Sequence, residues 1–407
     1  MTFLVAPWSN DNNTDVTHFP PRAEEWVHGK LPYRDVDFEY PPLAVPLIGL
    51  PALVDVGSYK LGFGLIALAF GLALVALCAE AARLSGGDGR RAAFAMALTP
   101  FLAGALVRGY FDLAPMAITL AALVALLRSR TRLGFGLLGL AVMTKGFPLV
   151  VAPVALAWLF GRGRRRDGLE GLAVMGAVIV VLGGAVLAIS PKGAWYAIHY
   201  QIARPVEIES SPASLLYAWD WIAGRGGQIV GSYGSINFEH PGGRALGVAF
   251  GVLLVAVVAL LSYRAARLRD QRTLLVASLG AVAAFAAFGK VFSPQYVIWL
   301  LPLTALAVGW GDWAIAGLGA AATLLTRIEF PTNFGDLVER RIGVVLTVME
   351  RNLAVVVLVA LTAGVAGWKG RWYHRKGPSS RDPRSRSEAA SVVREAAGDP
   401  PQPPSRR

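Results

Sequence analysis

Cysteine and histidine, the side chains that most often build metal and redox sites, are scarce in this sequence. Cys78 is the only cysteine among 407 residues, which excludes an intrachain disulfide and a site with several thiolate ligands. The five histidines are scattered, and none of them forms an H-x-x-x-H or similar metal-binding spacing. We therefore expect no cofactor, and a bound divalent ion is the one alternative that the sequence leaves open.

Charged residues are also scarce. Only 16% of the residues are charged, against about 25% in a typical soluble domain. Apolar residues make up 55% of the chain and come in long blocks such as "LGFGLIALAFGLALVALCAE" and "GLAVMGAVIVVLGGAVLAIS". Each block approaches the roughly 20 residues that a helix needs to cross a bilayer. The sequence therefore predicts an all-α polytopic membrane protein.

The net charge of +12 suggests nucleic acid as a partner, but the distribution of the charge favours another interpretation. The basic residues gather in short loops between apolar blocks, as membrane topology requires. The clusters are Arg83/Arg90/Arg91, Arg128/Arg130/Arg132, Arg162/Arg164/Arg165/Arg166 and Arg264/Arg267/Arg269/Arg272. By the positive-inside rule they face the cytoplasm, and we expect no nucleic acid partner.

This rule gives a consistent topology with about eleven crossings. The expected single spans lie near residues 59–80, 92–107, 112–127, 171–190, 244–262, 273–289, 295–309, 313–326 and 352–368. The block 133–160 starts and ends at basic clusters, so it must cross an even number of times. We expect two short helices there, separated at "TKGFP" (144–148), and a long polar outer loop over residues 191–243.

The remaining segments complete the expected domain organisation. Residues 1–40 form an outer catalytic-type segment, 41–368 the transmembrane domain, and 369–407 a basic, disordered cytoplasmic tail. "MTFLVAPW" reads like the end of a truncated first helix. "PPLAVPLIGLPALV" (41–54) is too short to cross and holds four prolines, so we expect a broken or re-entrant segment that lines protein and not lipid.

One glycine motif has two interpretations. "GFGLLG" (134–139) matches G-x-G-x-x-G, but a dinucleotide fingerprint needs a strand before it and a helix after it. This motif lies within an apolar block just after an arginine cluster. Close packing between membrane helices explains it better.

Polar residues gather at the ends of the expected spans on the outer side. Solvated surface, interfacial belts and snorkelling explain many of them. Lys145 and Lys290 are different, because each lies between two apolar spans, and an ionisable group at that depth is a functional-site hypothesis.

Several of these segments together resemble a known family. "PYRD", "EYPPL", the "TKGFP" break, the "IES" loop and "FSPQYVIW" are similar to segments of glycosyltransferase family 87, over most of residues 14–310. That family contains the polyprenyl-phosphate-mannose-dependent mannosyltransferases of actinobacteria. The resemblance implies a GT-C-like helical bundle with outer-face loops.

The resemblance also implies a catalytic base in the first outer loop, before the "PY" that contains Tyr33. Asp15 matches that position, and Asp35 and Asp37 are the competing candidates. Phe19 departs from the pattern, because the family commonly has tyrosine there. Donor and product linkages in the family imply inversion in a single displacement, without a covalent nucleophile.

Sugar transfer at an outer membrane face would need a base for the acceptor hydroxyl and cations for the departing phosphate. Lys145, Arg204 and Lys290 are the candidates for the phosphate. Further candidates for substrate binding are His199, Arg108, Asp112, Tyr33, Gln295 and Tyr296. The expected partners are a lipid-linked sugar donor, a lipid or glycan acceptor, and the cell membrane.

Two other classes of function fit part of the sequence. Broken helices and lysines between spans also occur in a transporter or flippase for a lipid-linked envelope precursor. The absence of an internal repeat and the position of the charges at one face weigh against this alternative. A scaffold subunit of an envelope-synthesis complex is the third possibility, and it predicts that no single carboxylate matters.

Overall fold

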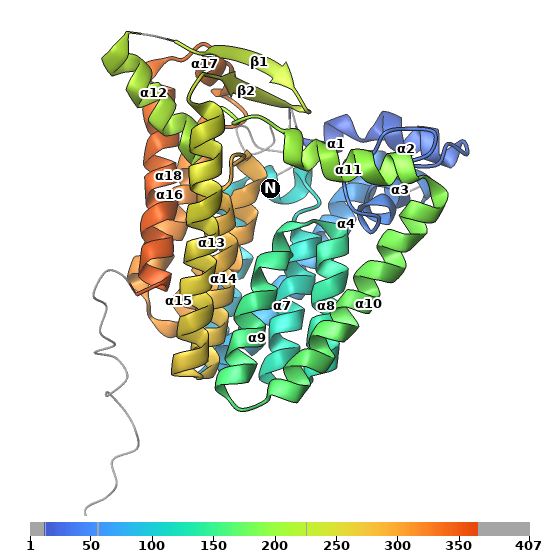
Figure 1. Ribbon diagram of the computed structural model, residues 1–407, viewed down its shortest axis with the longest axis vertical. Helices are drawn as coiled ribbons and strands as arrows, with labels where there is room; N and C mark the ends of the chain where they lie inside the picture. The colour runs from blue at the N-terminus through green and yellow to red at the C-terminus, as the bar shows by residue number, and fades with distance from the viewer. Residues whose placement is uncertain (1–11, 13, 55–56, 225, 365–407) are drawn as a thin grey trace, which may run out of the picture. The chain divides into compact units, whose positions relative to one another are not determined.

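The computed structural model describes residues 12, 14–54, 57–224 and 226–364. Within these ranges the chain is mostly helical, with one two-stranded antiparallel sheet (Figure 1). The expectation of an all-α polytopic membrane protein is confirmed. The expected truncated first helix and the expected tail over residues 369–407 lie outside the described residues.

In the described part of the chain, five helices are long and apolar enough to cross a membrane. They are α4 (Tyr59–Leu84), α10 (Arg165–Ile189), α13 (Gly243–Leu268), α14 (Gln271–Phe288) and α18 (Ile342–Thr362). Shorter helices pack between them: α5 (Gly89–Ala103), α7 (Leu113–Leu127), α8 (Thr131–Thr144), α9 (Val151–Gly161), α15 (Leu301–Trp310) and α16 (Trp313–Glu329). Every expected span overlaps one of these helices.

The largest departure concerns α18, which begins at Ile342 and not near residue 352. The sequence suggested a later start because charged residues interrupt the apolar run. Arg351 and Asn352 are nevertheless buried and hydrogen-bonded within the bundle, so the helix continues through them.

Aspartates begin three of the helices at one end of the bundle. Asp88 accepts hydrogen bonds from the backbone N–H groups of Arg90 and Arg91 at the start of α5. Asp270 and Asp312 cap α14 and α16 in the same way. Such caps satisfy N–H groups that have no partner within the helix.

The basic clusters meet at this same end. Glu80 accepts hydrogen bonds from both Arg83 and Arg128, which joins the first two clusters. Arg162 donates to the backbone carbonyl of Arg269 over 2.8 Å, which joins the third cluster to the fourth. The bundle therefore has one strongly basic end, as the positive-inside argument requires.

Residues 131–161 form the expected pair of short helices. α8 ends at Thr144, and the 3-10 helix η1 (Phe147–Val150) leads into α9. Arg164, just after α9, donates a 3.1 Å hydrogen bond to Thr131 Oγ1 at the start of α8. Both ends of the block thus lie together at the basic end, and Lys145 lies at the turn.

The "GFGLLG" motif lies within α8 and packs against two neighbouring helices. A methyl group added to Gly134 would come within 2.7 Å of Leu126 in α7. One added to Gly139 would come within 3.0 Å of Val178 in α10. The glycines therefore permit close helix packing, as expected.

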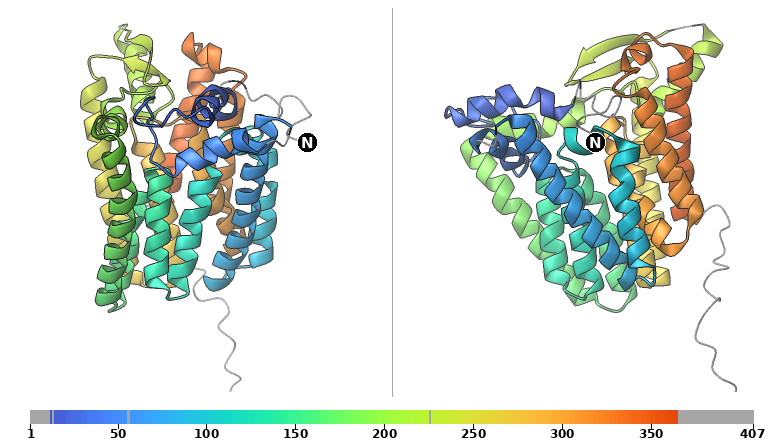
Figure 2. Two further views of the ribbon diagram at one scale, coloured as in Figure 1. Left: turned by 90° about the vertical axis from the view of Figure 1, so that its right-hand side faces the viewer. Right: turned by 180° about the vertical axis from the view of Figure 1, so that it is seen from behind.

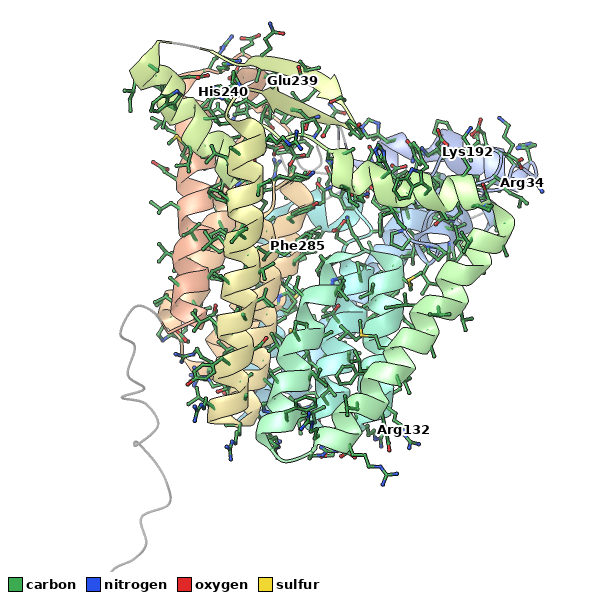
Figure 3. All side chains as sticks on the ribbon, in the orientation of Figure 1. Arg34, Arg132, Lys192, Glu239, His240 and Phe285 are labelled. Atoms are coloured by element: carbon green, nitrogen blue, oxygen red, sulfur yellow. The ribbon has the colours of Figure 1, made fainter. Side chains whose placement is uncertain are left out.

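Short elements cover the opposite end of the bundle (Figure 2). They are α1 (Asp15–His18), α2 (Pro20–Val27), α3 (Ala44–Leu53), α6 (Leu106–Gly109), α11 (Pro191–Ala203), α12 (Ser211–Ala223), β1 (Gln228–Ser232), β2 (Ser235–Glu239), η2 (Pro294–Leu300) and α17 (Phe334–Val338). The strands pair from Gln228↔Glu239 to Ser232↔Ser235. Most of the expected polar loop over 191–243 is therefore regular structure. Figure 3 shows Arg34, Lys192 and Glu239 at this end and Arg132 at the other.

The proline-rich segment 41–54 folds as the short helix α3, which contains Pro51. Its inner face packs against α2 and α4, and Ile48 is fully buried there. Leu50 and Leu53 are exposed, Leu53 at 65%. The expectation that protein surrounds this segment is therefore wrong for its outer face.

Candidate active site

Aromatic side chains hold the N-terminal segment over the end of the bundle. Phe19 packs edge-on against Tyr40, with ring centres 6.2 Å apart, and lies 6.3 Å from Phe111. Phe38 is fully buried and packs edge-on against Tyr33, with ring centres 5.4 Å apart. Phe19 is thus part of the packing that buries the start of α1.

Asp15 begins α1 and is only 8% exposed. Its side chain accepts a hydrogen bond from the backbone N–H of Phe111, and within the described residues its Oδ2 atom has no hydrogen-bond partner. Burial raises the pKa of this carboxyl well above its usual value; Lys145 lowers the pKa, while Asp112 and Glu39 raise it further. When ionised, such a carboxylate is a stronger base than a solvated one.

Asp112 and Lys145 form a buried ion pair next to Asp15. The Lys145 Nζ atom lies 2.8 Å from each carboxylate oxygen of Asp112. Trp299 Nε1 donates a third hydrogen bond to Asp112, over 2.6 Å. The ammonium group also lies over the ring of Phe111, 4.7 Å from its centre. The pair connects the start of α7, the break after α8, and η2.

Arg204 and Lys290 form a cationic pair at the same end. Arg204 follows α11, and within the described residues its Nε atom is buried without a hydrogen bond. Lys290 donates to the backbone carbonyl of Ile202. Burial and the charge of Arg204 lower the pKa of Lys290. Because two like charges repel, this arrangement favours the binding of an anion between them.

Glu207 connects the segment after α11 to the "FSPQY" segment. Its carboxylate accepts hydrogen bonds from the backbone N–H of Phe292 over 2.7 Å and from Ser293 Oγ over 2.6 Å. Arg204 lies 3.8 Å away, too far for a strong bond. Glu207 therefore balances the charge of Arg204 only in part.

Two tyrosines stand between the carboxylates and the cations. Tyr40 has Asp15 and Asp112 as electrostatic neighbours, and also Arg204. Tyr296 has Arg204 and Asp112 as electrostatic neighbours. Its ring stacks on that of Trp299, with ring centres 3.8 Å apart. Asp15 and the cationic pair thus belong to one site, although residues 15, 204 and 290 are far apart in sequence.

The structure separates the three acidic candidates for the base. Asp35 and Asp37 are exposed. Asp35 pairs with Arg34 over 2.9 Å, and this hydrogen-bonded pair lowers the pKa of its carboxyl. Of the three, only Asp15 is buried beside the Asp112–Lys145 pair.

The other candidates for substrate binding differ in how deeply they are buried. Arg108 and Tyr33 are buried, and Tyr33 donates a 2.7 Å hydrogen bond to the backbone carbonyl of Tyr40. Gln295 is half-buried. His199 is exposed on α11, and its ring lies 5.9 Å from that of Trp195.

Sequence reasoning missed two buried charged residues at this end, Glu329 and Arg351. Each interrupts an apolar run, in "TRIEF" and "MERNL", and ionisable residues within membrane segments are functional candidates. The expected spans of 313–326 and 352–368 leave both residues in the loop between them, so neither was considered as a site residue.

The fold and these contacts define a polytopic helical membrane protein with a buried site of carboxylates, cations and aromatic rings at the end opposite its basic clusters. The model of glycosyltransferase family 87 matches residues 38–294, more than half of the chain. The chain belongs to glycosyltransferase family 87, and it is a membrane glycosyltransferase.

The search of curated proteins gives no match. Among solved structures, the chain is similar to the crystal structure of ArnT from Cupriavidus metallidurans bound to undecaprenyl phosphate. The identity is 17% and the TM-score 0.40, over 87% of this chain and 72% of that one.

Proposed function

We propose that this enzyme transfers a hexose, with mannose as the first candidate, from a polyprenyl-phosphate donor to a lipid or glycan acceptor on the outer face of the membrane. The observation that carries the proposal is the buried Asp15 carboxylate, with an oxygen that has no partner in the described structure, beside the Asp112–Lys145 pair. Membership of family 87 supports the donor class.

In this proposal Asp15 is the general base. It accepts the proton of the acceptor hydroxyl while that oxygen forms a bond to the anomeric carbon. The bond from that carbon to the phosphate oxygen breaks in the same step, and the polyprenyl phosphate leaves with the electron pair. One displacement inverts the anomeric configuration, so no covalent intermediate on the enzyme is needed.

Arg204 and Lys290 stabilise the departing phosphate in this scheme. They lie close together with only partial charge balance from Glu207, which supports a role in anion binding. Lys145 was also a candidate for the phosphate, but Asp112 already supplies it with a counter-charge. Its proposed role is to hold Asp112 and to lower the proton affinity of Asp15.

The outer-face location rests on charge distribution. Asp15, Arg204 and Lys290 lie at the end opposite the arginine clusters, which the positive-inside rule assigns to the cytoplasm. A donor at that face is lipid-linked, with its phosphate at the interface where Arg204 and Lys290 lie.

The direct test uses membranes that contain the wild-type protein, total lipid and radiolabelled polyprenyl-phosphate-mannose. Membranes with Asp15→Asn serve as the matched control, and polyprenyl-phosphate-glucose tests sugar preference. We expect a new labelled lipid or glycan with the wild type only. Label that crosses the bilayer without a new glycosidic bond would favour a flippase and contradict the proposal.

A further inference from the structure

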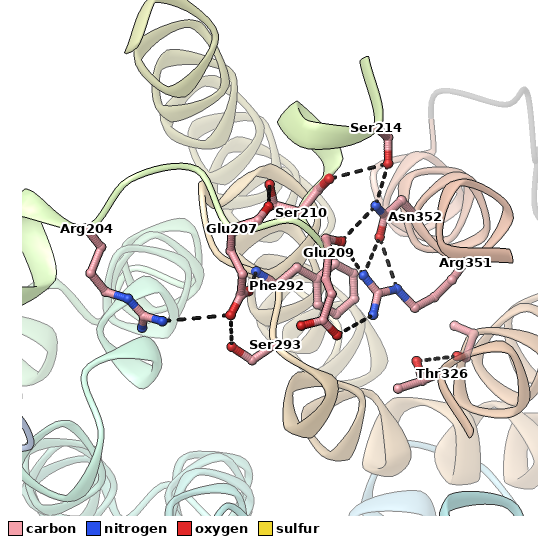
Figure 4. A network of polar contacts seen from close by, with 11 residues as sticks. Arg204, Glu207, Glu209, Ser210, Ser214, Phe292, Ser293, Thr326, Arg351 and Asn352 are labelled. Carbon is pink, nitrogen blue, oxygen red and sulfur yellow. Dashed lines mark hydrogen bonds and ion pairs between the residues drawn. The ribbon is translucent and has the colours of Figure 1, made fainter. Parts of the chain in front are cut away.

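A second buried polar cluster lies beside the candidate active site (Figure 4). Its charged members are Glu209, in the segment after α11, Glu329 at the end of α16, and Arg351 in α18. Glu329 and Arg351 are 0% exposed and Glu209 is 3% exposed. Burial of three charged groups in one place is costly unless each charge has a partner.

Neighbouring groups fix part of the cluster. Arg351 donates to the backbone carbonyl of Glu209 and, over 3.1 Å, to Asn352 Oδ1. Asn352 donates to the same carbonyl over 3.0 Å and to Ser214 Oγ over 2.9 Å. The guanidinium also lies over the ring of Phe292, 4.1 Å from its centre. Arg351 is therefore held in one orientation.

Glu209 and Glu329 face each other, and a hydrogen bond joins their carboxyl groups when Glu209 is protonated. That bond leaves one Glu329 oxygen without a partner, and within the described residues Arg351 Nη1 and the Tyr217 hydroxyl, which neighbours Glu209, have no hydrogen-bond partner. The contact between Arg351 Nη1 and Glu209 Oε1 is long, at 3.9 Å. Because buried polar atoms are nearly always hydrogen-bonded, this group points to a missing polar ligand.

Tyr110 connects this cluster to the candidate active site. Its hydroxyl has Asp15 and Asp112 as electrostatic neighbours, and also Glu209 and Glu329. A group bound at Glu329 would therefore lie next to the chemistry proposed for Asp15.

The charges of the cluster restrict what it can bind. An anion would face two carboxylates. A metal ion would meet the positive charge of Arg351, and among the described residues no group of three or more His, Cys, Asp or Glu side chains is arranged to hold one. Burial and the nearby Glu329 raise the pKa of Glu209 well above its usual value, which favours the proton that joins the two carboxyl groups. Arg351 Nη1 and the Tyr217 hydroxyl remain as donors, and Glu329 remains as an acceptor. Donors and acceptors side by side match hydroxyl groups, which both donate and accept.

We propose that Glu209, Glu329 and Arg351 form a subsite that binds the hydroxyl groups of a sugar ring during transfer. The ring belongs either to the donor hexose or to a sugar of the acceptor. The inference rests on the proposed function, because it assigns a substrate contact to the same site.

The test compares wild-type full-length protein in lipid nanodiscs with Glu329→Gln and Arg351→Lys. Glu350→Gln is the matched control, since Glu350 is an exposed neighbour of Arg351 on α18. The probes are polyprenyl phosphate without sugar, polyprenyl-phosphate-mannose, and a mannose disaccharide as an acceptor surrogate. Dissociation constants and melting temperatures are measured for every protein.

We expect Glu329→Gln to weaken the binding of one sugar-bearing probe by about 10- to 100-fold, as for the loss of a hydrogen bond to a charged group. Binding of sugar-free polyprenyl phosphate should not change in any variant. Weaker binding of polyprenyl-phosphate-mannose assigns the subsite to the donor, and weaker binding of the disaccharide assigns it to the acceptor. If Glu329→Gln does not fold, Glu209→Gln replaces it.

The inference is overturned if every variant binds both sugar-bearing probes as tightly as the wild type, whatever happens to the melting temperature. The cluster would then be a structural clamp or a site for water. Failure of the proposed function is a separate result: the wild type would form no product from any polyprenyl-phosphate sugar. The binding constants would still decide the inference in that case.

Discussion

At the scale of single residues, Asp15 differs from the other acidic residues of its segment because its carboxylate is buried and only partly hydrogen-bonded. A buried carboxylate has lost most of its hydration and gains more from accepting a proton. Exposed carboxylates such as Asp35 and Asp37 keep that hydration. This difference makes Asp15 the strongest candidate for the base.

Asp15→Asn should lower kcat by about 10²- to 10⁴-fold, the usual contribution of a general base. The amide keeps the shape of the side chain but cannot accept the proton, so donor binding should change little. Steady-state kinetics and donor binding measure the two effects. Asp35→Asn and Asp37→Asn are the controls; a dead Asp35→Asn with an active Asp15→Asn would contradict the assignment.

The same substitution should raise the melting temperature at pH 7. Because folding raises the pKa of Asp15, its contribution to stability is complete below its unfolded-state pKa near 3.8 and is lost as the pH rises through the higher folded-state value. The uncharged asparagine avoids that loss. A variant that is inactive but at least as stable separates a catalytic role from a folding role.

The rate should rise with pH through the raised pKa of Asp15, because only the ionised carboxylate accepts a proton. Lys145 lowers this pKa, and Asp112 and Glu39 raise it. Glu39→Gln removes one negative neighbour and should therefore shift the rising limb of kcat/KM to lower pH. A shift in the opposite direction would show that another group controls the profile.

Lys290→Met should weaken donor binding by about 10- to 100-fold, as expected for the loss of a charge-assisted hydrogen bond. Binding of a neutral acceptor sugar should not change. Lys192→Met is a control, because Lys192 is an exposed lysine at the same end of the bundle. Equal donor affinity in wild type and Lys290→Met would remove Lys290 from the phosphate site.

At the scale of elements, the break after α8 places Lys145 against the start of α7. The Asp112–Lys145 bond and the Trp299 hydrogen bond connect three elements that meet beside Asp15. This network keeps the carboxylate of Asp112 close to Asp15 without leaving either oxygen of Asp112 unpaired. Rigid packing of this kind would hold the candidate base in position to accept a proton.

Asp112→Asn removes the hydrogen-bonded counter-charge of the buried Lys145 and should lower the free energy of unfolding by about 3–5 kcal/mol. The double variant Asp112→Asn/Lys145→Met should be more stable than the single variant, because both charges are gone. Unfolding in detergent micelles measures both. Glu170→Gln is a control, since its pairing with Arg132 is on the surface and should matter little.

At the scale of the whole molecule, the described helices have a basic end and an end that carries the candidate site. The bundle therefore has two ends of different charge, and by the positive-inside rule this difference predicts the side of the membrane on which the candidate site lies. The only cysteine, Cys78, is buried, which leaves the surface free for cysteine labelling.

Lys192→Cys should react with a membrane-impermeant maleimide in intact cells, whereas Arg166→Cys should react only after permeabilisation. Both positions are exposed, and the Arg166 side chain is 91% exposed in its ion pair. The reverse pattern would place the site on the cytoplasmic side and contradict the outer-face proposal. The family assignment would not be affected.

The sequence by itself determined the membrane class, the positions of the spans and the break at Lys145. These features depend on local properties: runs of apolar residues long enough for a bilayer, and charges that cannot lie in it. The family motifs also indicated the segment that contains Asp15, the candidate base. The predicted start of α18 is wrong, because the expected span of 352–368 begins just after Arg351, whereas the helix begins at Ile342.

The resemblance placed Asp15 before Asp35 and Asp37, but only the tertiary structure shows that Asp15 alone of the three is buried, because burial depends on packing with Phe111 and Lys145, which lie far along the chain. The same reason explains why the sequence did not reveal the cluster of Glu209, Glu329 and Arg351. Arg351 in α18 contacts Glu209 in the segment between α11 and α12, and no local pattern encodes that pairing. A charged residue in an apolar run shows that a partner is needed, and only the fold shows which partner it meets.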